Sequence, residues 1–395
     1  MDQLKRVVIA GAGIGGLTAA LALAKQGVDV VVCEQASQLG EVGAGLQVSP
    51  NASRVLIKLG LADALKSKVF EPDYASIRDY RSGEYYLKAP LGKGAEIQYR
   101  APYWHVHRAD LHAILAEACQ VHGVDILLNA TVSGYQQEQA GVVLQLQDGR
   151  SVQADLLIGA DGIHSAVRTQ LLGPEKPTFM GQVAWRGVIP VEALSVNVKP
   201  EACVWAGPGK HLVTYYLRGG QDVNFVAVEE RSDWRSESWR EEGDVAQLRR
   251  AFAGWHSDVT DLLAAAKSSF LWSLNGRAEL PTWHDEGVVL LGDACHPMLP
   301  FMAQGAAMAI EDAYVLADQL SQNAVSTALM NYEAIRKPRA TKIQQMSAAN
   351  AGLYHMHGGL FGKAKLKGLQ MVTAVAPNLI QSKLDFVFGH DVTQG

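Results

Sequence analysis

The sequence predicts an α/β protein in which a helix-covered parallel sheet carries an inserted, mostly antiparallel domain and is followed by a helical C-terminus. Residues 7–27 are typical of a buried strand, a glycine turn and a helix, and residues 28–34 of a second buried strand, which is how a parallel sheet begins. Residues 180–230 alternate apolar and polar side chains, the period of antiparallel strands with one packed face. Helical patterns fill residues 303–388.

The order of these patterns along 395 residues predicts two domains built from separate segments. A helix at 109–123, short strands at 123–162 and a buried strand at 287–293 extend the parallel-sheet part. We expect a nucleotide-binding domain with C-terminal helices from residues 1–70, 101–177 and 276–395, and a substrate-binding domain from residues 71–100 and 178–275.

Composition excludes several classes of partner. The net charge is −5, so neither a nucleic acid nor an anionic membrane is expected. No apolar run is long enough to predict a membrane span, and the N-terminus enters a strand almost at once, without a signal peptide. The four cysteines form no CxxC motif, so we expect free thiols in the reducing cytoplasm, and no metal site is predicted.

A glycine-rich turn predicts a Rossmann-like dinucleotide site. Gly11, Gly13 and Gly16 have the spacing GxGxxG between a strand and a helix, which permits a tight turn and close approach of the backbone to a pyrophosphate. The helix N-terminus offers free N–H groups to the phosphates. Glu34 ends the second strand, where a carboxylate binds ribose hydroxyls. A glycine turn kept only for packing is the alternative.

Two further strands end in an aspartate. Asp161 closes the apolar run LLIGAD, and Asp293 closes VVLLGD, so both are expected at the carboxyl edge of the sheet, where ligands bind. Each alone could be an ordinary turn. Together with the glycine turn they are too many for one nicotinamide, and they indicate a larger dinucleotide. An NAD-dependent dehydrogenase is a remote alternative that leaves both aspartates unexplained.

These motifs resemble those of a known family, the single-component FAD-dependent aromatic hydroxylases with the p-hydroxybenzoate hydroxylase fold. The resemblance rests on GAGIGG, GADGIHSAVR and LLGDACHPMLPFMAQGAAMAIEDA, with Arg108 in VHRADLH, and it covers nearly the whole chain. Within the family the sequence resembles 6-hydroxynicotinate 3-monooxygenases, and next to them salicylate and 3-hydroxybenzoate hydroxylases. It implies a flavoprotein that uses NAD(P)H and O₂, through a C4a-hydroperoxyflavin, to hydroxylate a hydroxylated aromatic or N-heteroaromatic compound, with or without decarboxylation.

The resemblance implies particular cofactor contacts. The glycine turn would hold the pyrophosphate of FAD and Glu34 the adenosine ribose, while Arg108 and Asp293 would contact the ribitol and phosphate. Asp161 would lie in a motif used for both FAD and the reduced pyridine nucleotide. The complete implied set is Gly11, Gly13, Gly15, Gly16, Glu34, Gln35, Gly45, Arg108, Asp161, Asp293, Gly305 and Ala306. A homodimer is a further expectation.

The substrate contacts that the resemblance implies are Gln47, Cys203, His211, Tyr215, Pro300 and Phe301. We expect His211 to be the base or orienting group and Tyr215 to donate to a substrate oxygen. The alternatives are a surface histidine, a tyrosine ring in the core and, for Cys203, a small buried hydrophobe. Pro297 and Pro300 would stiffen a loop whose carbonyls face the substrate, and His296 would hold that loop.

Two positions depart from the hydroxynicotinate enzymes, which carry histidine where this chain has Gln47 and Phe301. The pocket should therefore be less basic and more apolar at one wall. A related hydroxylated aromatic or N-heteroaromatic substrate is expected. A non-acid heteroaromatic compound such as a quinolone or urate is the alternative, and so is a protein that binds FAD without catalysis.

Overall fold

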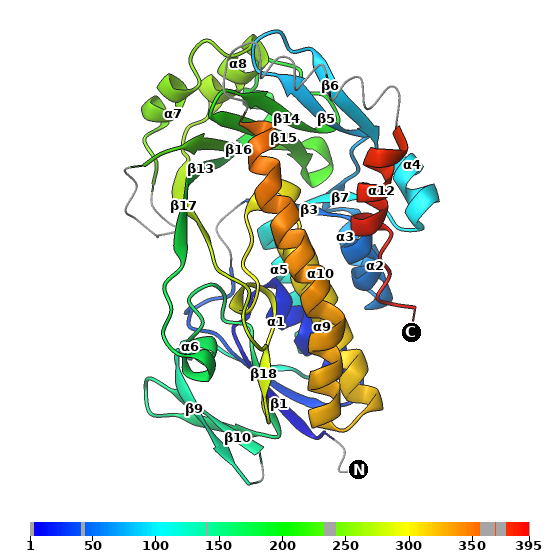
Figure 1. The fold of residues 1–395 in the computed structure, drawn as a ribbon, viewed down its shortest axis with the longest axis vertical. Helices are drawn as coiled ribbons and strands as arrows, with labels where there is room; N and C mark the ends of the chain where they lie inside the picture. The colour runs from blue at the N-terminus through cyan, green and yellow to red at the C-terminus, as the bar shows by residue number, and fades with distance from the viewer. Residues whose placement is uncertain are drawn as a thin grey trace.

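The structure, a computed structural model, describes residues 4–40, 44–139, 141–232, 242–355, 368 and 377–394 (Figure 1). A parallel sheet lies at one end of the molecule and a large antiparallel sheet at the other. A long helix, α10 (Val325–Tyr354), runs beside α9 (Gly305–Gln322) and joins the two ends. At 1.5 Å per residue its 30 residues span about 45 Å, long enough to contact both sheets.

The first sheet has six strands in the order β18-β19-β12-β1-β2-β8. Its central pairs are parallel, and only the edge strand β18 runs antiparallel. The strands are β1 (Arg6–Ala10), β2 (Asp29–Cys33), β8 (Asp125–Leu127), β12 (Leu156–Gly159), β18 (His284–Asp285) and β19 (Val288–Leu290). Because they come from distant segments of the chain, the predicted parallel sheet of non-contiguous segments is confirmed.

Helices cover this sheet because its central strands are apolar on both faces. Helix α1 packs against both α5 and α9. The helices of this part are α1 (Ile14–Ala24), α2 (Pro50–Lys58), α3 (Ala62–Lys66), α5 (Arg108–Val121) and α6 (Ala166–Leu172). Two small antiparallel sheets flank it: β3 (Gly45–Val48), β4 (Val69–Phe70) and β7 (Trp104–His107), and β9 (Val132–Glu138), β10 (Gly141–Leu146) and β11 (Ser151–Ala154).

The largest sheet has seven strands in the order β17-β13-β16-β15-β14-β5-β6. All neighbours are antiparallel except β14 and β5, so the expected mostly antiparallel part is confirmed. The strands are β5 (Tyr74–Asp79), β6 (Tyr85–Pro90), β13 (Thr178–Pro190), β14 (Glu201–Gly207), β15 (Lys210–Leu217), β16 (Asp222–Glu230) and β17 (Phe270–Gly276). The domain boundaries themselves stay a prediction.

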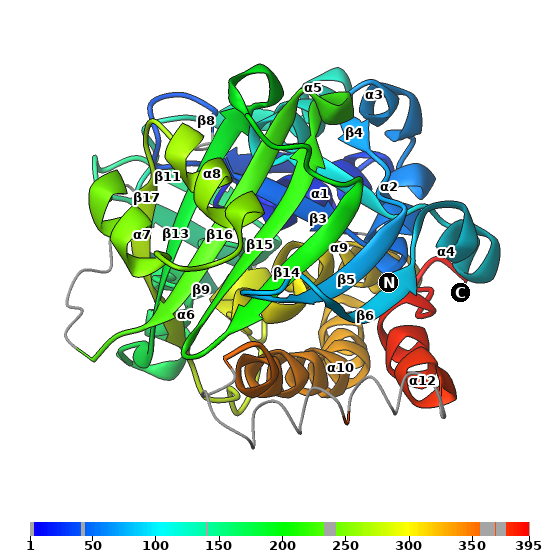
Figure 2. The ribbon, with the colours of Figure 1, turned by 90° about the horizontal axis from the view of Figure 1, so that it is seen from above.

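Helices α7 (Val245–Ala251) and α8 (Ser257–Ala265) cover the outer face of this sheet (Figure 2). Their apolar side chains share a core with Trp185, Leu212 and Phe225 of the sheet. The remaining elements are α4 (Gly92–Tyr99), α12 (Pro377–Phe388) and the short turns η1 (Val191–Ala193), η2 (Arg218–Gly220), η3 (Gly292–Ala294) and η4 (Pro300–Met302). The helical C-terminus is confirmed for α9, α10 and α12, and the rest of 356–376 apart from Gly368 lies outside the described residues.

Candidate active site

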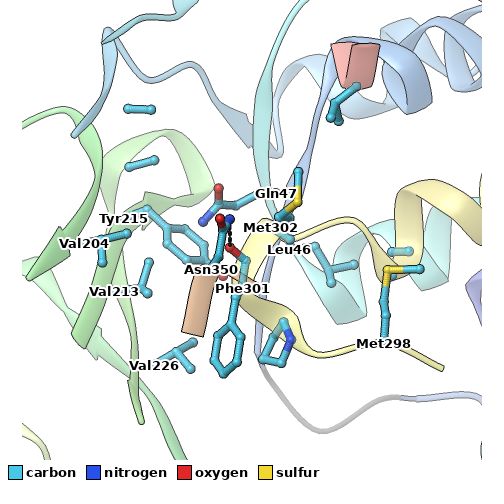
Figure 3. Close-up of a pocket in the computed structure, with 18 of the residues that line it drawn as sticks. Leu46, Gln47, Val204, Val213, Tyr215, Val226, Met298, Phe301, Met302 and Asn350 are labelled. Carbon is cyan, nitrogen blue, oxygen red and sulfur yellow. Dashed lines mark hydrogen bonds between the residues drawn. The ribbon is translucent and has the colours of Figure 1, made fainter. Parts of the chain in front are cut away.

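A cavity of about 600 Å³ lies between the inner face of the seven-stranded sheet and the carboxyl ends of the parallel strands. Gly13, Gly162 and Asp293, which follow β1, β12 and β19, line one side of it. Valines of β14, β15 and β16 line the other side, opposite Phe301 and Met302 (Figure 3). The three strand ends singled out in the sequence therefore meet at one cavity, as the geometry of parallel sheets requires.

The glycine turn has no room for side chains at two of its positions. Gly11 has φ +101°, and a Cβ there would lie 2.5 Å from the carbonyl oxygen of Ala160. A Cβ on Gly16 would collide with the carbonyl oxygen of Gly11. A Cβ on Gly13, by contrast, would meet nothing within 4 Å, and this residue lines the cavity. The turn thus presents bare backbone to an open space of the kind that a pyrophosphate fills.

Two helix N-termini face this cavity. Helix α1 has Gly13 at its N-cap and α9 has Gln304, and neither cap residue makes a side-chain hydrogen bond to the helix. Neither helix has an acidic residue in its first turn, so the first N–H groups are available to an anionic group. Gly305 and Ala306 at the start of α9 line the cavity, and Gly15 of α1 does too.

Glu34 lies beside the glycine turn but does not line the cavity. Its two carboxylate oxygens accept backbone N–H bonds from Ala12 and Ala36, each at 2.9 Å. These bonds hold the half-buried carboxylate at the end of β2, next to the exposed Gln35. This is the position from which the expected ribose contact would be made.

Asp161 is half-buried, whereas Asp293 is exposed toward the cavity that it lines. One oxygen of Asp161 accepts the N–H groups of Ala166 and Val167, while Oδ1 is buried and has no hydrogen-bond partner among the described residues. Burial raises the pKa of Asp161. The protein groups around Asp293 raise its pKa as well, against the opposing positive charges of His296 and Arg108. Arg108, at the start of α5, lines the same cavity as Asp293.

The expected catalytic pair projects from one strand. His211, Val213 and Tyr215 alternate along β15 so that all three line the cavity. Across from them lie Gln47, which accepts a 2.7 Å hydrogen bond from Tyr103, and Phe301. Pro300 also lines the cavity. Gly45 lies against the Tyr215 ring, because a Cβ there would come within 2.5 Å of the ring carbon Cε2.

Burial sets the protonation of this pair. It lowers the pKa of His211 well below 6.5, and the neighbouring His355 lowers it further, so the imidazole is neutral and can accept a proton. Burial raises the pKa of Tyr215, and the charge of Arg186 only partly opposes it. Tyr215 is therefore a neutral phenol that can donate a hydrogen bond.

Cys203 does not reach the cavity, so the expected substrate contact does not fit its position. Its neighbours Ala202 and Val204 line the cavity, and strand alternation sends the Cys203 side chain to the outer face of the sheet. There it packs with Trp205 and Leu212. Burial raises the pKa of its thiol to about 12, as for a small buried hydrophobe.

The proline-containing loop also differs from expectation, because α10 takes up its carbonyls. Gln344 donates to Pro297 at 2.8 Å, Ser347 to Leu299 at 2.6 Å, and Tyr354 to Phe301 at 3.2 Å. The expectation of free carbonyls facing the substrate is therefore wrong. Rather than binding a ligand, these groups fix the loop, and with it the Phe301 ring.

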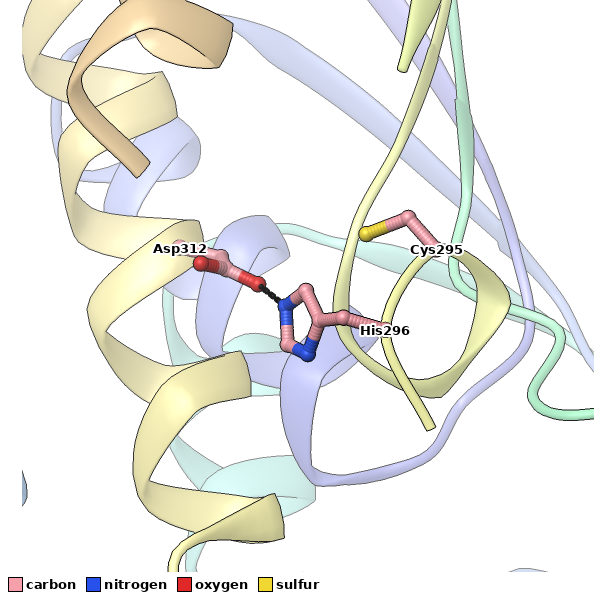
Figure 4. Close-up of side chains that lie close together, drawn as sticks. All are labelled: Cys295, His296 and Asp312. Atoms are coloured by element: carbon pink, nitrogen blue, oxygen red, sulfur yellow. Dashed lines mark hydrogen bonds and ion pairs between the residues drawn. The ribbon is translucent and has the colours of Figure 1, made fainter. Parts of the chain in front are cut away.

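His296 holds the base of this loop (Figure 4). Its Nε2 donates to Asp312 at 2.5 Å, and both side chains are buried. Burial opposes a charge on His296, but attraction by Cys295 and Asp312 raises its pKa well above 6.5, so it is paired as a cation. Asp312 and Glu311 are in turn bound by Arg336 at 2.8 and 2.5 Å. His296, Asp312, Arg336 and Glu311 thus form one buried network of ion pairs.

Two residues near the cavity could not be assigned to it from the sequence. The motif AWRG does not show which of its side chains faces the cavity. In the structure Trp185 lies in the outer core, and Arg186 lines the cavity. Arg186 is stacked over Trp272, with Cζ 4.1 Å from the ring centroid, and no described carboxylate forms an ion pair with it. The other missed residue, His355, bonds His211 from the end of α10 and carries no motif at all.

Comparison with known proteins settles the family. A family described as FAD binding domain matches residues 5–347. The chain belongs to this FAD-binding family. Among relatives, a 6-hydroxynicotinate 3-monooxygenase of Pseudomonas fluorescens is 40% identical over 89% of this chain and 93% of the relative. A 3-hydroxybenzoate 6-hydroxylase of Aquipseudomonas alcaligenes is 36% identical over 89% and 90%.

Among solved structures, HpxO of Klebsiella pneumoniae in complex with FAD and uric acid superposes with a TM-score of 0.86. It is 28% identical, and the match covers 98% of this chain and 97% of that one. The flavoprotein is thus an FAD-dependent aromatic monooxygenase, and the resemblance noted in its sequence is confirmed. An NAD-dependent dehydrogenase does not account for these matches.

The residues at the cavity fit FAD. Bare glycine backbone, two uncapped helix N-termini and the unpartnered Oδ1 of Asp161 are the groups that phosphates and hydroxyls of a dinucleotide would meet.

Among the described residues, no helix is both long and apolar enough to cross a membrane.

Proposed function

We propose that this enzyme hydroxylates a hydroxylated aromatic or N-heteroaromatic acid, with His211 as the base that receives the substrate hydroxyl proton. The observation that carries the proposal is a neutral imidazole, 1% exposed, in the wall of the cavity that the FAD motifs also line. A phenol or hydroxypyridine becomes electron-rich at its ring carbons when it loses that proton, so a base at this wall serves hydroxylation.

When bound, FAD supplies the redox chemistry, namely reduction by NAD(P)H and the activation of O₂. The chain supplies the rest. Gly11, Gly13, Gly16 and the start of α1 would hold the pyrophosphate, and Glu34 the ribose, with Gln35 beside it. Arg108 and Asp293 would bind the ribitol and phosphate.

The remaining proposed cofactor contacts border the same space. Gly305 and Ala306 at the start of α9 line the cavity, where N–H groups and the helix dipole would stabilise negative charge on bound reduced flavin. Gly15 and Gly45 would also contact the cofactor, and Asp161 would serve both FAD and the pyridine nucleotide.

On the substrate side, Tyr215 would donate to a substrate oxygen, and Gln47, Pro300 and Phe301 would shape the pocket. Arg186 supports an anionic substrate. Arg186 is half-buried, and its buried Nε has no partner among the described residues. Loss of water around the guanidinium lowers its pKa only to about 10, so it remains charged at neutral pH. A carboxylate on the substrate would neutralise it.

A second candidate substrate class is a non-acid heteroaromatic compound, such as a quinolone or urate. It is supported by the TM-score of 0.86 to HpxO with bound uric acid, and by the apolar Phe301 wall. We further propose a cytoplasmic location, in line with four free buried cysteines, and a homodimer.

The proposal is tested by purifying the protein, confirming bound FAD by its yellow colour, and following NAD(P)H consumption with hydroxybenzoates, hydroxynicotinates, hydroxyquinolines and urate. Peroxide is measured alongside. We expect one hydroxylated acid to stimulate NADH or NADPH oxidation with little peroxide. Stimulation by urate or a quinolone alone would favour the second candidate. Bound FAD with no stimulation by any compound would favour a flavin-binding protein without catalysis.

A further inference from the structure

Behind His211, two more ionisable side chains continue from the cavity wall to the protein surface. His211 Nδ1 lies 2.6 Å from His355 Nε2, and His355 Nδ1 lies 3.0 Å from an Oε1 of Glu230. His211 and His355 are buried, whereas the Glu230 side chain is 39% exposed. The three groups come from β15, the end of α10 and the end of β16.

From this chain of contacts we propose that Glu230 and His355 form a proton relay that carries the substrate hydroxyl proton from His211 to solvent. The inference rests on the proposed role of His211 as the base. It adds an exit path, because a base sealed inside a cavity must pass its proton on before the site is restored.

The polarity of the relay follows from the carboxylate. Glu230 can only accept, so in the neutral form of His355 the proton is on Nδ1 and Nε2 is an acceptor. Nδ1 of His211 must then donate to that acceptor, which leaves Nε2 of His211 without a hydrogen. Glu230 therefore fixes, through two hydrogen bonds, the tautomer in which His211 can accept a proton from the cavity.

The proton steps balance without any redox partner. The substrate O–H proton goes to His211 Nε2 as the Nδ1 proton of His211 passes to His355 Nε2. The Nδ1 proton of His355 passes to Glu230 and then to water. Both imidazoles remain neutral throughout, the substrate keeps the negative charge, and the reverse sequence returns the proton when the product hydroxyl forms.

Among the described residues, three other polar side chains lie near the pair, and each has a different arrangement. Tyr354 packs against His211 with ring centroids 5.2 Å apart, but its hydroxyl donates to the Phe301 carbonyl. Gln182 is 3.5 Å from His355 Nδ1, longer than the Glu230 contact. The adjacent Glu229 points to the other face of the sheet, where it bonds Trp185 and pairs with Lys210.

The first test needs no substrate. In the FAD-loaded enzyme labelled with ¹⁵N-histidine, NMR should show His211 and His355 as neutral rings protonated at Nδ1, with signals assigned from the His211→Gln and His355→Gln variants. Glu230→Gln should abolish the fixed Nδ1-protonated state of His355, and Glu229→Gln should leave it. A His355 protonated at Nε2 in the wild type would overturn the relay.

The second test uses 6-hydroxynicotinate and 3-hydroxybenzoate as probes with the holoenzyme. Glu230→Gln and His355→Ala should lower kcat about tenfold or more near neutral pH, with KM little changed and FAD retained. The deficit should shrink as the pH rises, because the substrate then ionises unaided. Glu229→Gln should keep the wild-type pH profile, and added imidazole should partly restore His355→Ala.

Equal pH profiles of Glu230→Gln and Glu229→Gln would contradict the relay. If the wild type turns over neither probe, the proposed substrate class fails for these acids, while the histidine tautomers still decide on the relay.

Discussion

The ring of Phe301 meets the imidazole of His211 edge to face, with centroids 5.2 Å apart and planes inclined at 73°. Phe301 is itself fixed from behind, since its carbonyl accepts hydrogen bonds from Asn350 and Tyr354 of α10. An apolar ring at this place keeps His211 dry. Exclusion of water lowers the pKa of the imidazole, so this contact links the shape of the pocket to the protonation state of His211.

Phe301 and Gln47 should therefore govern substrate choice. The double variant Gln47→His, Phe301→His would place two imidazoles at the cavity wall, the arrangement that the resemblance to hydroxynicotinate enzymes implies. We expect kcat/KM for 6-hydroxynicotinate to rise about tenfold relative to 3-hydroxybenzoate, a change of about 1.4 kcal/mol in discrimination. Phe301→Leu, which keeps the wall apolar, is the matched control. An unchanged ratio in the double variant would rule out this wall as the specificity determinant.

Loss of His211 should separate flavin binding from hydroxylation. His211→Gln should retain FAD but lower turnover about 100-fold, and divert oxidised NAD(P)H toward peroxide. The pH dependence follows from the depressed pKa of His211, because the imidazole stays neutral through pH 6.5. Wild-type kcat/KM should therefore be constant through pH 6.5 and fall only in more acidic solution. Unchanged coupling in the variant, or an acid limb above pH 6.5, would argue against His211 as the base.

Cys203 offers a contrasting test on the neighbouring strand. Cys203→Ala should leave kcat/KM within about twofold of wild type, because the thiol lies on the outer face of the sheet, and should cost about 1 kcal/mol of folding free energy through lost packing. Steady-state kinetics and denaturant unfolding measure the two effects. A large rise in KM with an unchanged free energy of unfolding would indicate that Cys203 contacts the substrate.

Local sequence patterns place the strand ends at the cavity more directly than they place the residues of its opposite wall. Gly11, Asp161 and Asp293 each follow a short apolar run, and parallel strands bring their carboxyl ends together, so local pattern decided their position. His211 and Tyr215 were expected from the family resemblance, and both line the cavity because residues four apart on a strand share a face.

What escaped prediction depends on contacts between distant segments. The alternation of side chains along a strand indicates which residues share a face with Cys203. It does not indicate that α7 and α8 cover that face. The loop carbonyls were assigned to substrate because nothing in the loop shows that α10 donates to them. His355 bonds His211 across 144 residues and lies in no motif, so only the packed chain reveals it.

Asp293 should contribute to FAD retention. Asp293→Asn removes the carboxylate that faces the cavity beside Arg108, so we expect the Kd for FAD to rise about tenfold, near 1.4 kcal/mol. Ultrafiltration with flavin fluorescence of the filtrate measures the release. Asp285→Asn, in the edge strand β18 beside the start of β19 and outside the cavity lining, is the charge-matched control and should retain FAD fully. Equal retention in both variants would remove Asp293 from the cofactor site.

The buried network around Arg336 should dominate the response of stability to acid. Burial alone would raise the pKa of Asp312, but His296 and Arg336 hold it at about 2, below its value in the unfolded chain. Its contribution to stability is therefore present above pH 3.8, the ordinary pKa of an aspartate, and is lost as the pH falls through about 2.

Arg336→Leu leaves Glu311 and Asp312 without this buried partner, so we expect a loss of about 3–5 kcal/mol in the free energy of unfolding at neutral pH. That deficit should narrow in acid, because protonated carboxyls no longer require the guanidinium. Lys337→Leu, which breaks the more exposed pair with Glu333, should cost under about 1 kcal/mol. Denaturant unfolding across pH measures both. Equal losses of unfolding free energy in the two variants would show that burial does not increase the contribution of the network to stability.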